Sequence, residues 1–283
     1  MIAIIDGGST KCDWVILESD GTAKCQISTL GFNPNTADLN LVHDEIEKNA
    51  ALEPLKNHIT RLFYYGTGCG TLANVQKVEE LFRKIFPHAE ILVKEDLTAA
   101  AYAAYNGQPA IVCILGTGSN ACFFDGKTVR RDLPSLGFLI GDEGSGNALG
   151  KALLKRFFMK KLPSDLELAF QEAYALTIDE ALKNMYHNPR ANAYLGEFNK
   201  FVAEHKSHPY FQHMVFEEMK NFFNFQVLPY PEAHTAEINF IGFVAYLYED
   251  VLRAAAADLN LRVGRIVKKP IDSLVDYHKK YIL

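Results

Sequence analysis

The chain has 283 residues, of which 48% are hydrophobic and 22% are charged, and this balance is typical of a folded globular protein. Its length leaves room for about two domains, each with a sizeable hydrophobic core. The net charge is −5 at pH 7 and no basic stripe stands out, which argues against nucleic acid as the main partner.

The first predicted elements form a hairpin around a glycine turn. Residues 2–21, IAIIDGGSTKCDWVILESDG, begin with an apolar, β-branched run that predicts a buried strand. Gly7 and Gly8 follow it and lack a Cβ, so their backbone can approach a bulky ligand, and successive N–H groups in such a turn bind anions. Trp14 is expected in the core. Taken alone, this segment is better explained as an ordinary tight hairpin.

The rest of the first half alternates helices and strands. In chain order we expect a helix at 39–55, a strand at 61–66, a helix at 74–86, a strand at 90–94 and a helix at 96–105. Asp96 stands at the start of the last helix, where an acidic side chain can act as the N-cap. Tyr64 and Tyr65 are neighbours in a strand, so one is expected to face the core and the other the outside.

A second hairpin repeats the pattern of the first. Residues 111–126, IVCILGTGSNACFFDG, again combine an apolar run, a Gly/Ser/Thr turn, a strand-like run and an Asp-Gly turn. One such turn is weak evidence, but two of them, with Asp6 at the end of the first strand, favour phosphate binding. The repeat therefore predicts two similar lobes that face one nucleotide.

The second half is mostly helical. We expect a helix at 147–159, a helical insert at about 163–208, a helix at 212–230, a strand from 237 that turns into a helix at Gly242, a helix at 245–259, a strand at 262–267 and a closing helix at 270–281. The insert carries no signature of a site.

The cysteines and the apolar runs indicate a cytoplasmic protein. The five cysteines include no Cys-x-x-Cys pair, so free thiols are expected, with Cys12, Cys113 and Cys122 as small buried side chains. The chain starts directly on a strand, and no apolar run is long enough to span a membrane. We therefore expect no signal peptide and no membrane partner.

Four motifs together resemble a known family. DGGSTKCDW, ILGTGSN, GDEGSGNALG and INFIGFVA occur in this order, and the chain resembles the BadF/BadG/BcrA/BcrD-type ATPases and N-acetylglucosamine kinases of the actin-like ATPase superfamily. The closing PIDSLVDYHKKY is similar to the family's C-terminal helix. The resemblance covers nearly the whole chain, and residues 141–145 are its most specific part.

The resemblance implies an α/β fold of two ribonuclease-H-like lobes with a cleft between them. The first lobe would comprise residues 1–106, with the helix at about 270–283 packing back on it. The second would comprise 107–269 and contain the helical insert. ATP and Mg²⁺ would bind at the floor of the cleft and the sugar on the first-lobe side. A homodimer is usual among similar proteins.

The resemblance also implies a set of site residues. Those matching nucleotide-binding positions are Asp6, Gly7, Gly8, Ser9, Thr10, Lys11, Gly116, Thr117, Gly118, Ser119, Gly242 and Phe243. Those matching sugar-binding positions are Asn33, Asn35, Thr117, Gly118, Asn120 and Asp142. Asp96 matches the general base, and Asp6 would hold Mg²⁺ through water, since Mg²⁺ usually keeps several waters.

The residues themselves leave other roles open at several of these positions. Asp6 can cap its turn, Asp96 can cap its helix, and lone asparagines are common turn formers. If the backbone at Asp142 and Glu143 is extended, the two side chains point to opposite sides. The resemblance implies that Asp142 is the one that faces the cleft, and Glu143 would be an acid at a helix start.

The chain departs from the family at two positions. Leu136 stands where similar N-acetylglucosamine kinases often have tryptophan, so the aromatic platform for the sugar is missing. Phe243 stands where a second small residue is common, and it can crowd the base or stack on it.

The expected activity is ATP-dependent phosphorylation of an amino sugar at the 6-hydroxyl. N-acetylglucosamine, glucosamine and N-acetylmuramic acid are the candidate substrates. One alternative is an ATPase that activates an electron-transfer enzyme, although its iron–sulfur cluster needs cysteines that the scattered thiols here do not suggest. Another is a pantothenate kinase, which does not need the motif at residues 141–145.

Overall fold

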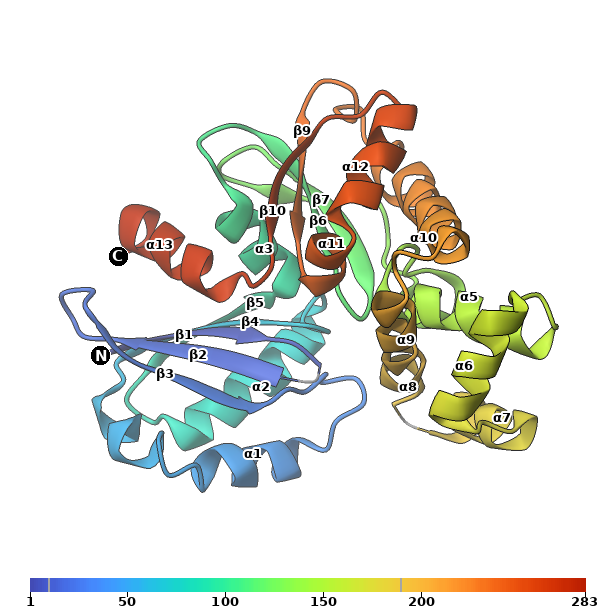
Figure 1. Cartoon of the computed structure of the whole chain (residues 1–283). Coiled ribbons are helices and arrows are strands. Elements are labelled where there is room, and N and C mark those ends of the chain that lie inside the picture. Colours follow the sequence, from blue (N-terminus) through green and yellow to red (C-terminus); the bar gives the residue numbers. More distant parts are fainter. Residues whose placement is uncertain (10, 189) are drawn as a thin grey trace. The chain divides into compact units, whose positions relative to one another are not determined.

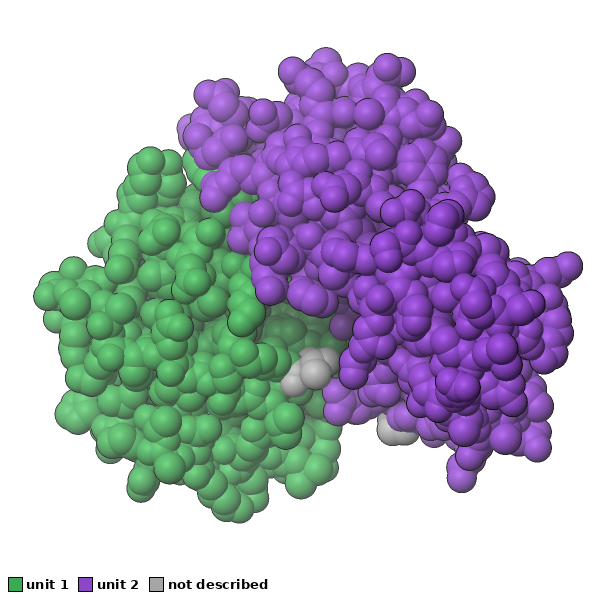
Figure 2. Space-filling model, in the orientation of Figure 1, with its two compact units in different colours: residues 1–105, 269–283 green, residues 106–268 purple. Residues whose placement is uncertain are grey.

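The computed structural model describes residues 1–9, 11–188 and 190–283 of the chain (Figure 1). The chain divides into two compact units, which Figure 2 colours separately. Unit 1 comprises residues 1–105 and 269–283, and unit 2 comprises residues 106–268. Within the described residues, the structure contains no helix long and apolar enough to cross a membrane.

The described residues of unit 1 form a five-stranded mixed sheet in the order β3-β2-β1-β4-β5. The strands are β1 (Ile2–Gly7), β2 (Lys11–Leu17), β3 (Ala23–Leu30), β4 (Arg61–Gly66) and β5 (Glu90–Glu95). β1, β2 and β3 form an antiparallel meander, whereas β4 and β5 run parallel to β1. The carboxyl ends of β1, β4 and β5 therefore lie at one edge of the sheet, where the first glycine turn begins and Asp96 follows.

Helices cover both faces of this sheet. They are α1 (Leu39–Glu47), the 3₁₀ helix η1 (Glu53–His58), α2 (Leu72–Ile85), α3 (Asp96–Ala104) and α13 (Ile271–Tyr281). Figure 1 shows α1 and α2 on one face and α3 and α13 on the other. Trp14 is buried in the core on the α2 side, as predicted, and its ring lies edge-on to Phe82 at 6.0 Å.

The expectation that one of two neighbouring tyrosines faces outward is wrong. Tyr64 and Tyr65 are both buried, because α3 and α13 cover the second face of the sheet. The Tyr65 hydroxyl forms a hydrogen bond of 2.8 Å with Nε2 of His278 on α13. This contact joins the carboxyl-terminal helix to the centre of the sheet.

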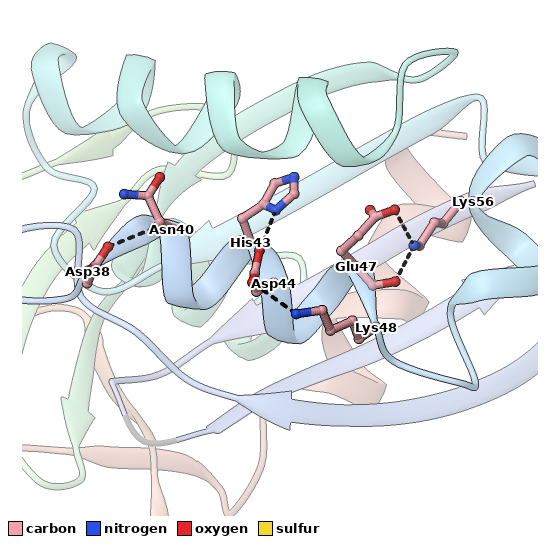
Figure 3. Close-up of polar contacts among 7 residues, drawn as sticks. All are labelled: Asp38, Asn40, His43, Asp44, Glu47, Lys48 and Lys56. Atoms are coloured by element: carbon pink, nitrogen blue, oxygen red, sulfur yellow. Dashed lines mark hydrogen bonds and ion pairs between the residues drawn. The ribbon is translucent and has the colours of Figure 1, made fainter.

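The expected helix at 39–55 ends early. α1 stops at Glu47, and the side chain of Asn49 accepts hydrogen bonds from the backbone of the following residues, which turns the chain toward η1. Figure 3 shows how this region is held: Asp38 caps α1, and buried Lys56 contacts both the carboxylate and the backbone carbonyl of Glu47. Pro54, which was expected near the helix end, lies in the first turn of η1.

The described residues of unit 2 repeat this sheet with the order β10-β9-β6-β7-β8. The strands are β6 (Ala110–Leu115), β7 (Ser119–Phe124), β8 (Val129–Arg130), β9 (Glu237–Ile241) and β10 (Val263–Val267). β6, β7 and β8 are antiparallel, and β9 and β10 run parallel to β6. The repeat that the two hairpins predicted therefore extends to the two whole sheets. The predicted α/β fold class is confirmed.

The helices of unit 2 are α4 (Gly137–Ile140), α5 (Gly146–Phe158), α6 (Ser164–Tyr174), α7 (Ile178–His187), α8 (Ala191–Glu197), α9 (Asn199–Glu204), α10 (Pro209–Phe222), the π-helix η2 (Phe223–Val227), α11 (Phe243–Leu247) and α12 (Glu249–Asp258). The helix expected at 147–159 is confirmed as α5, whereas those expected at 212–230 and 245–259 are shorter or broken. The predicted single helix at 245–259 is interrupted at Tyr248, whose buried hydroxyl donates to Oδ1 of Asn199 at 2.8 Å. The residue at which this helix breaks is therefore also tied to α9, a segment distant in sequence.

Candidate functional site

The first glycine turn of unit 1 is tightly packed. A Cβ on Gly7 would collide with the buried ring of Tyr64, so only glycine fits there. The N–H of Gly8 donates to the carbonyl of Lys11 at 2.9 Å and closes the turn. Ser9 lies in the described part of the turn, whereas Thr10, which was expected to bind phosphate, lies outside the described residues. The Lys11 ammonium pairs with Asp13 at 2.6 Å.

Asp6 lies where carboxylates gather. It ends β1 beside the turn, and its partner in the antiparallel register is Asp13. Burial, and after it the negative charges of Asp96 and Asp13, raise the pKa of Asp6 to about 7. A cation placed here would offset that repulsion and restore the ionised carboxylate.

This chemistry fits a magnesium ion held mainly by other ligands. Within residues 1–9, 11–188 and 190–283, no group of three or more His, Cys, Asp or Glu could hold a metal ion by itself. Mg²⁺ in proteins usually binds one or two carboxylates and completes its shell with water and substrate phosphates. A single carboxylate such as Asp6 would meet that requirement, with the predicted contact through water.

Asp96 lies at the same edge of the sheet as Asp6. β5 ends at Glu95, which is the register partner of Gly66 at the end of β4. The helix α3 begins at Asp96 with Glu95 in the N-cap position, so the alternative that Asp96 is the N-cap is wrong. Burial and the charges of Asp96 and Glu95 raise the pKa of Cys69 to about 12. The thiol in the neighbouring turn therefore stays protonated at neutral pH.

The two asparagines predicted to bind sugar belong to a local hydrogen-bond network. Oδ1 of Asn33 accepts from the backbone N–H and the side-chain amide of Asn35, both at 3.0 Å. Oδ1 of Asn35 accepts from the amide of Asn74 at 2.8 Å, and the same amide donates to the carbonyl of Gly68. Asn33 is thus a turn former, and the network ties its loop to the turn after β4. Sequence reasoning missed Asn74, whose only signal is its place in the first turn of α2.

The second glycine turn is held by Asp142. One carboxylate oxygen of Asp142 accepts from the backbone N–H of Ser119 at 3.1 Å, and the other accepts from the side-chain amide of Asn147 at 2.8 Å. The N–H of Gly116 donates to the carbonyl of Gly118 at 3.0 Å and closes the turn. A Cβ on Gly118 would lie 2.9 Å from Oδ2 of Asp142, so a larger residue there would displace this carboxylate.

The start of α5 adds a second link to the same turn. The N–H groups of Gly146 and Asn147 donate to the carbonyls of Gly116 and Thr117, at 2.8 and 3.0 Å. The motif at residues 141–145 and the glycine turn, which are separate in sequence, therefore form one unit of structure. Asn147 is a residue of this site that sequence reasoning missed, although it directly follows the motif.

The expectation for the acidic pair in this motif is wrong in part. Asp142 has φ of 61°, so its backbone is left-handed and not extended. The side chain of Glu143 accepts from the amide of Gln226 at 3.0 Å. The N-cap of α5 is Ser145, so Glu143 is not an acid at the helix start.

Two buried polar atoms beside the second turn have no partner among the described residues. They are the hydroxyl of Ser119 and Oδ1 of Asn147. Buried polar atoms are normally satisfied, so these atoms are candidates to contact a ligand. Asn120, the remaining residue predicted here, uses its Oδ1 to accept from the backbone N–H of Ala121 at 2.9 Å.

Gly242 brings a third segment to this edge. Its φ is 126°, and a Cβ there would collide with the carbonyl of Leu115, so the position requires glycine. Phe243 follows at the start of α11 with 52% of its surface exposed. Leu136, at the position where similar kinases often have tryptophan, is 54% exposed just before α4.

Comparison with known proteins gives a family and several similar structures. Residues 5–207 match the profile of the BadF/BadG/BcrA/BcrD ATPase family. The structure is similar to that of a proposed N-acetylglucosamine kinase from Porphyromonas gingivalis, with 32% identity over 100% of both chains and a TM-score of 0.93. A search of curated proteins finds no match.

More distant structures share the fold alone. A proposed N-acetylglucosamine kinase from Chromobacterium violaceum is 17% identical over 98% of both chains, with a TM-score of 0.71. A ROK family glucokinase from Streptomyces griseus, solved with glucose and AMPPNP, is 15% identical over 98% of this chain and 97% of its own, with a TM-score of 0.57. These similarities confirm the predicted two-lobed α/β fold.

Proposed function

We propose that this chain, which belongs to the BadF/BadG/BcrA/BcrD ATPase family, is a kinase that transfers the γ-phosphoryl group of ATP to an amino sugar. The candidate sugars are N-acetylglucosamine, glucosamine and N-acetylmuramic acid, with the 6-hydroxyl as acceptor. The observation that carries the proposal is the placement of Asp6 and Asp96 at one edge of the unit 1 sheet. The full-length similarity to a proposed N-acetylglucosamine kinase supports the substrate class.

Asp96 is the general base of this proposal. Its carboxylate takes the proton of the sugar hydroxyl while the hydroxyl oxygen bonds to the γ-phosphorus, and the bond from phosphorus to the ADP oxygen breaks. A base within hydrogen-bond reach contributes typically ~10²–10⁴-fold to such a step. The carboxylate is well placed for this role because β5 delivers it to the edge at which Asp6 ends β1.

Asp6 has a different role from Asp96. Its raised pKa means that ionising the Asp6 carboxyl costs free energy when no cation is bound. A cation beside Asp6 would offset this cost, because an opposite charge favours the ionised carboxylate. Mg²⁺ would neutralise the negative charge of the transferred phosphoryl group, which is the main requirement of this chemistry. Lys11 would remain beside it as a counter-charge to Asp13 and to the phosphates.

The second glycine turn would hold the remaining phosphates. Thr117 and Gly118 form the tip of the turn, and the orphaned hydroxyl of Ser119 lies at its end. Backbone N–H groups in such a turn form an anion site. Asp142 already accepts two hydrogen bonds, so its first task in this proposal is to keep the turn in shape while it contacts the sugar.

The sugar would be bound by amide and carboxylate side chains. Asn33, Asn35 and Asn120 can each donate and accept hydrogen bonds, which suits sugar hydroxyls or an acetamido group. The amide hydrogens of Asn33 and Asn120 would serve here, because their carbonyl oxygens already accept internal hydrogen bonds. A cytoplasmic homodimer completes the proposal.

The test is a coupled assay of ADP release with a panel of acceptors. The panel contains the three amino sugars, plain hexoses and pantothenate, each with ATP and Mg²⁺. We expect release that depends on an amino sugar, with the phosphate at the 6-position by NMR of the product. Release that depends on pantothenate, or that needs no acceptor at all, would reject the proposal. Light scattering coupled to size-exclusion chromatography tests the dimer.

A further inference from the structure

The backbone of residues 142–144 has an unusual conformation. Asp142 has φ of 61° and Gly144 has φ of 69°, so both are left-handed. A residue other than glycine rarely adopts this conformation, and it persists only where the surrounding structure holds it. The N–H of Ser145 donates to the carbonyl of Asp142 at 3.2 Å, so residues 142–145 form a tight turn with Glu143 at its centre.

The carboxylate of Glu143 is held by a π-helical turn. η2 continues α10, and the N–H of Leu228 at its end donates to the carbonyl of Phe223, five residues earlier, at 2.8 Å. Such turns are rare and occur frequently at functional sites. The ring of Phe223 is buried in the core of unit 2, 5.9 Å from that of Phe240. Gln226, which is 8% exposed, donates from its amide to Oε2 of Glu143 at 3.0 Å, so the π-turn fixes a buried donor against the motif.

The conformation of the tight turn decides where the Asp142 carboxylate points. Its two oxygens accept from the backbone N–H of Ser119 and from the amide of Asn147. Glu143 is bonded directly to Asp142, so a movement of Glu143 would rotate the peptide between them and displace that carboxylate. The hydrogen bond from Gln226 resists this movement.

We propose that Gln226 is a positioning residue of this kinase: its hydrogen bond to Glu143 holds the tight turn and keeps the Asp142 carboxylate on the second glycine turn. A neutral amide suits this task, because it donates to a carboxylate without adding a charge. The consequence for ligand binding rests on the proposed function, in which the second glycine turn holds phosphates. The consequence for the tight turn itself needs no ligand, so the two can be tested separately.

The test first breaks this hydrogen bond and then restores it in the opposite direction. Gln226→Glu replaces the donor with a carboxylate of nearly the same shape, and at pH 8 the like charges at positions 143 and 226 repel. Adding Glu143→Gln restores the hydrogen bond, because the new amide donates to the carboxylate at position 226. Asn224→Glu is the matched control, since Asn224 is exposed on the same π-turn and its replacement changes the net charge equally. Gln226→Leu removes the donor without adding a charge and serves as a second variant if Gln226→Glu does not fold.

Two measurements on the full-length protein follow the tight turn and the ligand. Hydrogen–deuterium exchange without ligand reports how often the segment containing the N–H of Ser119 opens, and titration calorimetry with Mg-ADP reports binding. We expect Gln226→Glu to speed this exchange and to weaken ADP binding by about tenfold or more each, since a hydrogen bond to a charged group is replaced by repulsion. The double variant should return both quantities to wild-type values, and Asn224→Glu should change neither.

The outcomes separate this inference from the proposed function. Unchanged exchange at Ser119 in Gln226→Glu would overturn the inference, as would an equal increase in Asn224→Glu or a double variant that exchanges as fast as the single one. Faster exchange with unaltered ADP affinity would overturn the positioning role. A wild-type protein that binds no ADP would overturn the proposed function, and the exchange data would still decide whether Gln226 holds the tight turn.

Discussion

Replacing Asp6 with asparagine should stabilise unit 1 at alkaline pH. The pKa of Asp6 is raised from 3.8 to about 7 by burial and by two nearby carboxylates. A raised carboxyl pKa means that the folded protein binds the proton more tightly than the unfolded chain, so this group lowers stability as pH rises from about 4 to about 7. The shift is about three units at ~1.4 kcal/mol per unit, which gives a cost of about 4 kcal/mol above pH 7.

An amide at this position would carry no such cost, because it does not ionise. We therefore expect Asp6→Asn to raise the free energy of unfolding at pH 8 by up to about 4 kcal/mol, with no gain near pH 4. The figure is an upper limit, since Asp6 keeps some solvent exposure. Buried His278 has a pKa lowered to about 4 and acts in the opposite direction between pH 4 and 6.5. Comparing the variant with the wild type at each pH cancels that contribution.

The assay is urea unfolding followed by tryptophan fluorescence, in buffer with a chelator. The chain has a single tryptophan, and Trp14 is buried in the core of unit 1, so the signal reports the unit that contains Asp6. Asp20→Asn is the control, because Asp20 is an exposed carboxylate whose pKa is lowered by hydrogen bonds from Thr22. Its loss should give no stabilisation at pH 8.

A gain for Asp6→Asn of the same size at pH 4 and pH 8, or no gain at either, would refute the reasoning. The effect of added Mg²⁺ on the free energy of unfolding gives a second test. If Asp6 helps to hold the ion, Mg²⁺ should stabilise the wild type in proportion to the logarithm of its concentration and should stabilise the variant less. An equal effect on both proteins would remove Asp6 from the metal site.

Three further changes test other parts of the structure. Asp96→Asn should lower kcat by about 10²-fold or more and leave ADP affinity nearly unchanged; turnover like that of the wild type would reject Asp96 as the base. Gly242→Ala should destabilise unit 2 by about 1–3 kcal/mol in calorimetry. Gly107 also has a positive φ but open space around it, so Gly107→Ala should lose less stability. Equal losses of stability would show that the contact with Leu115 is unimportant. Tyr65→Phe should cost about 1–3 kcal/mol in urea unfolding, because it leaves buried His278 without its hydroxyl partner; a stability equal to the wild type would contradict that.

Local sequence patterns were sufficient to predict the central strands of the sheets and the repeated glycine-turn hairpin. The apolar runs of β1, β4 and β6 are mostly buried and end at or directly before a glycine, so short-range chemistry identified them. β5 was also predicted from its apolar run, although Val93 is its only buried residue. β3 and β8 were not predicted. β3 is mostly exposed and lacks a continuous apolar run, and β8 has only two residues, so both are strands because a neighbouring strand pairs with them.

The local motif also could not reveal how the candidate site is built. Nothing in the order of residues shows that Asp142 adopts a left-handed backbone and aims its carboxylate at the turn before β7. Asn74 has no motif of its own, and one of the groups to which its amide donates belongs to Asn35, 39 residues away. Backbone propensity and hydrophobic periodicity act over a few residues, so they can be recognised from the sequence alone. Hydrogen bonds and ring contacts between distant segments exist only after the sheets have brought those segments together, so their geometry had to come from the folded protein.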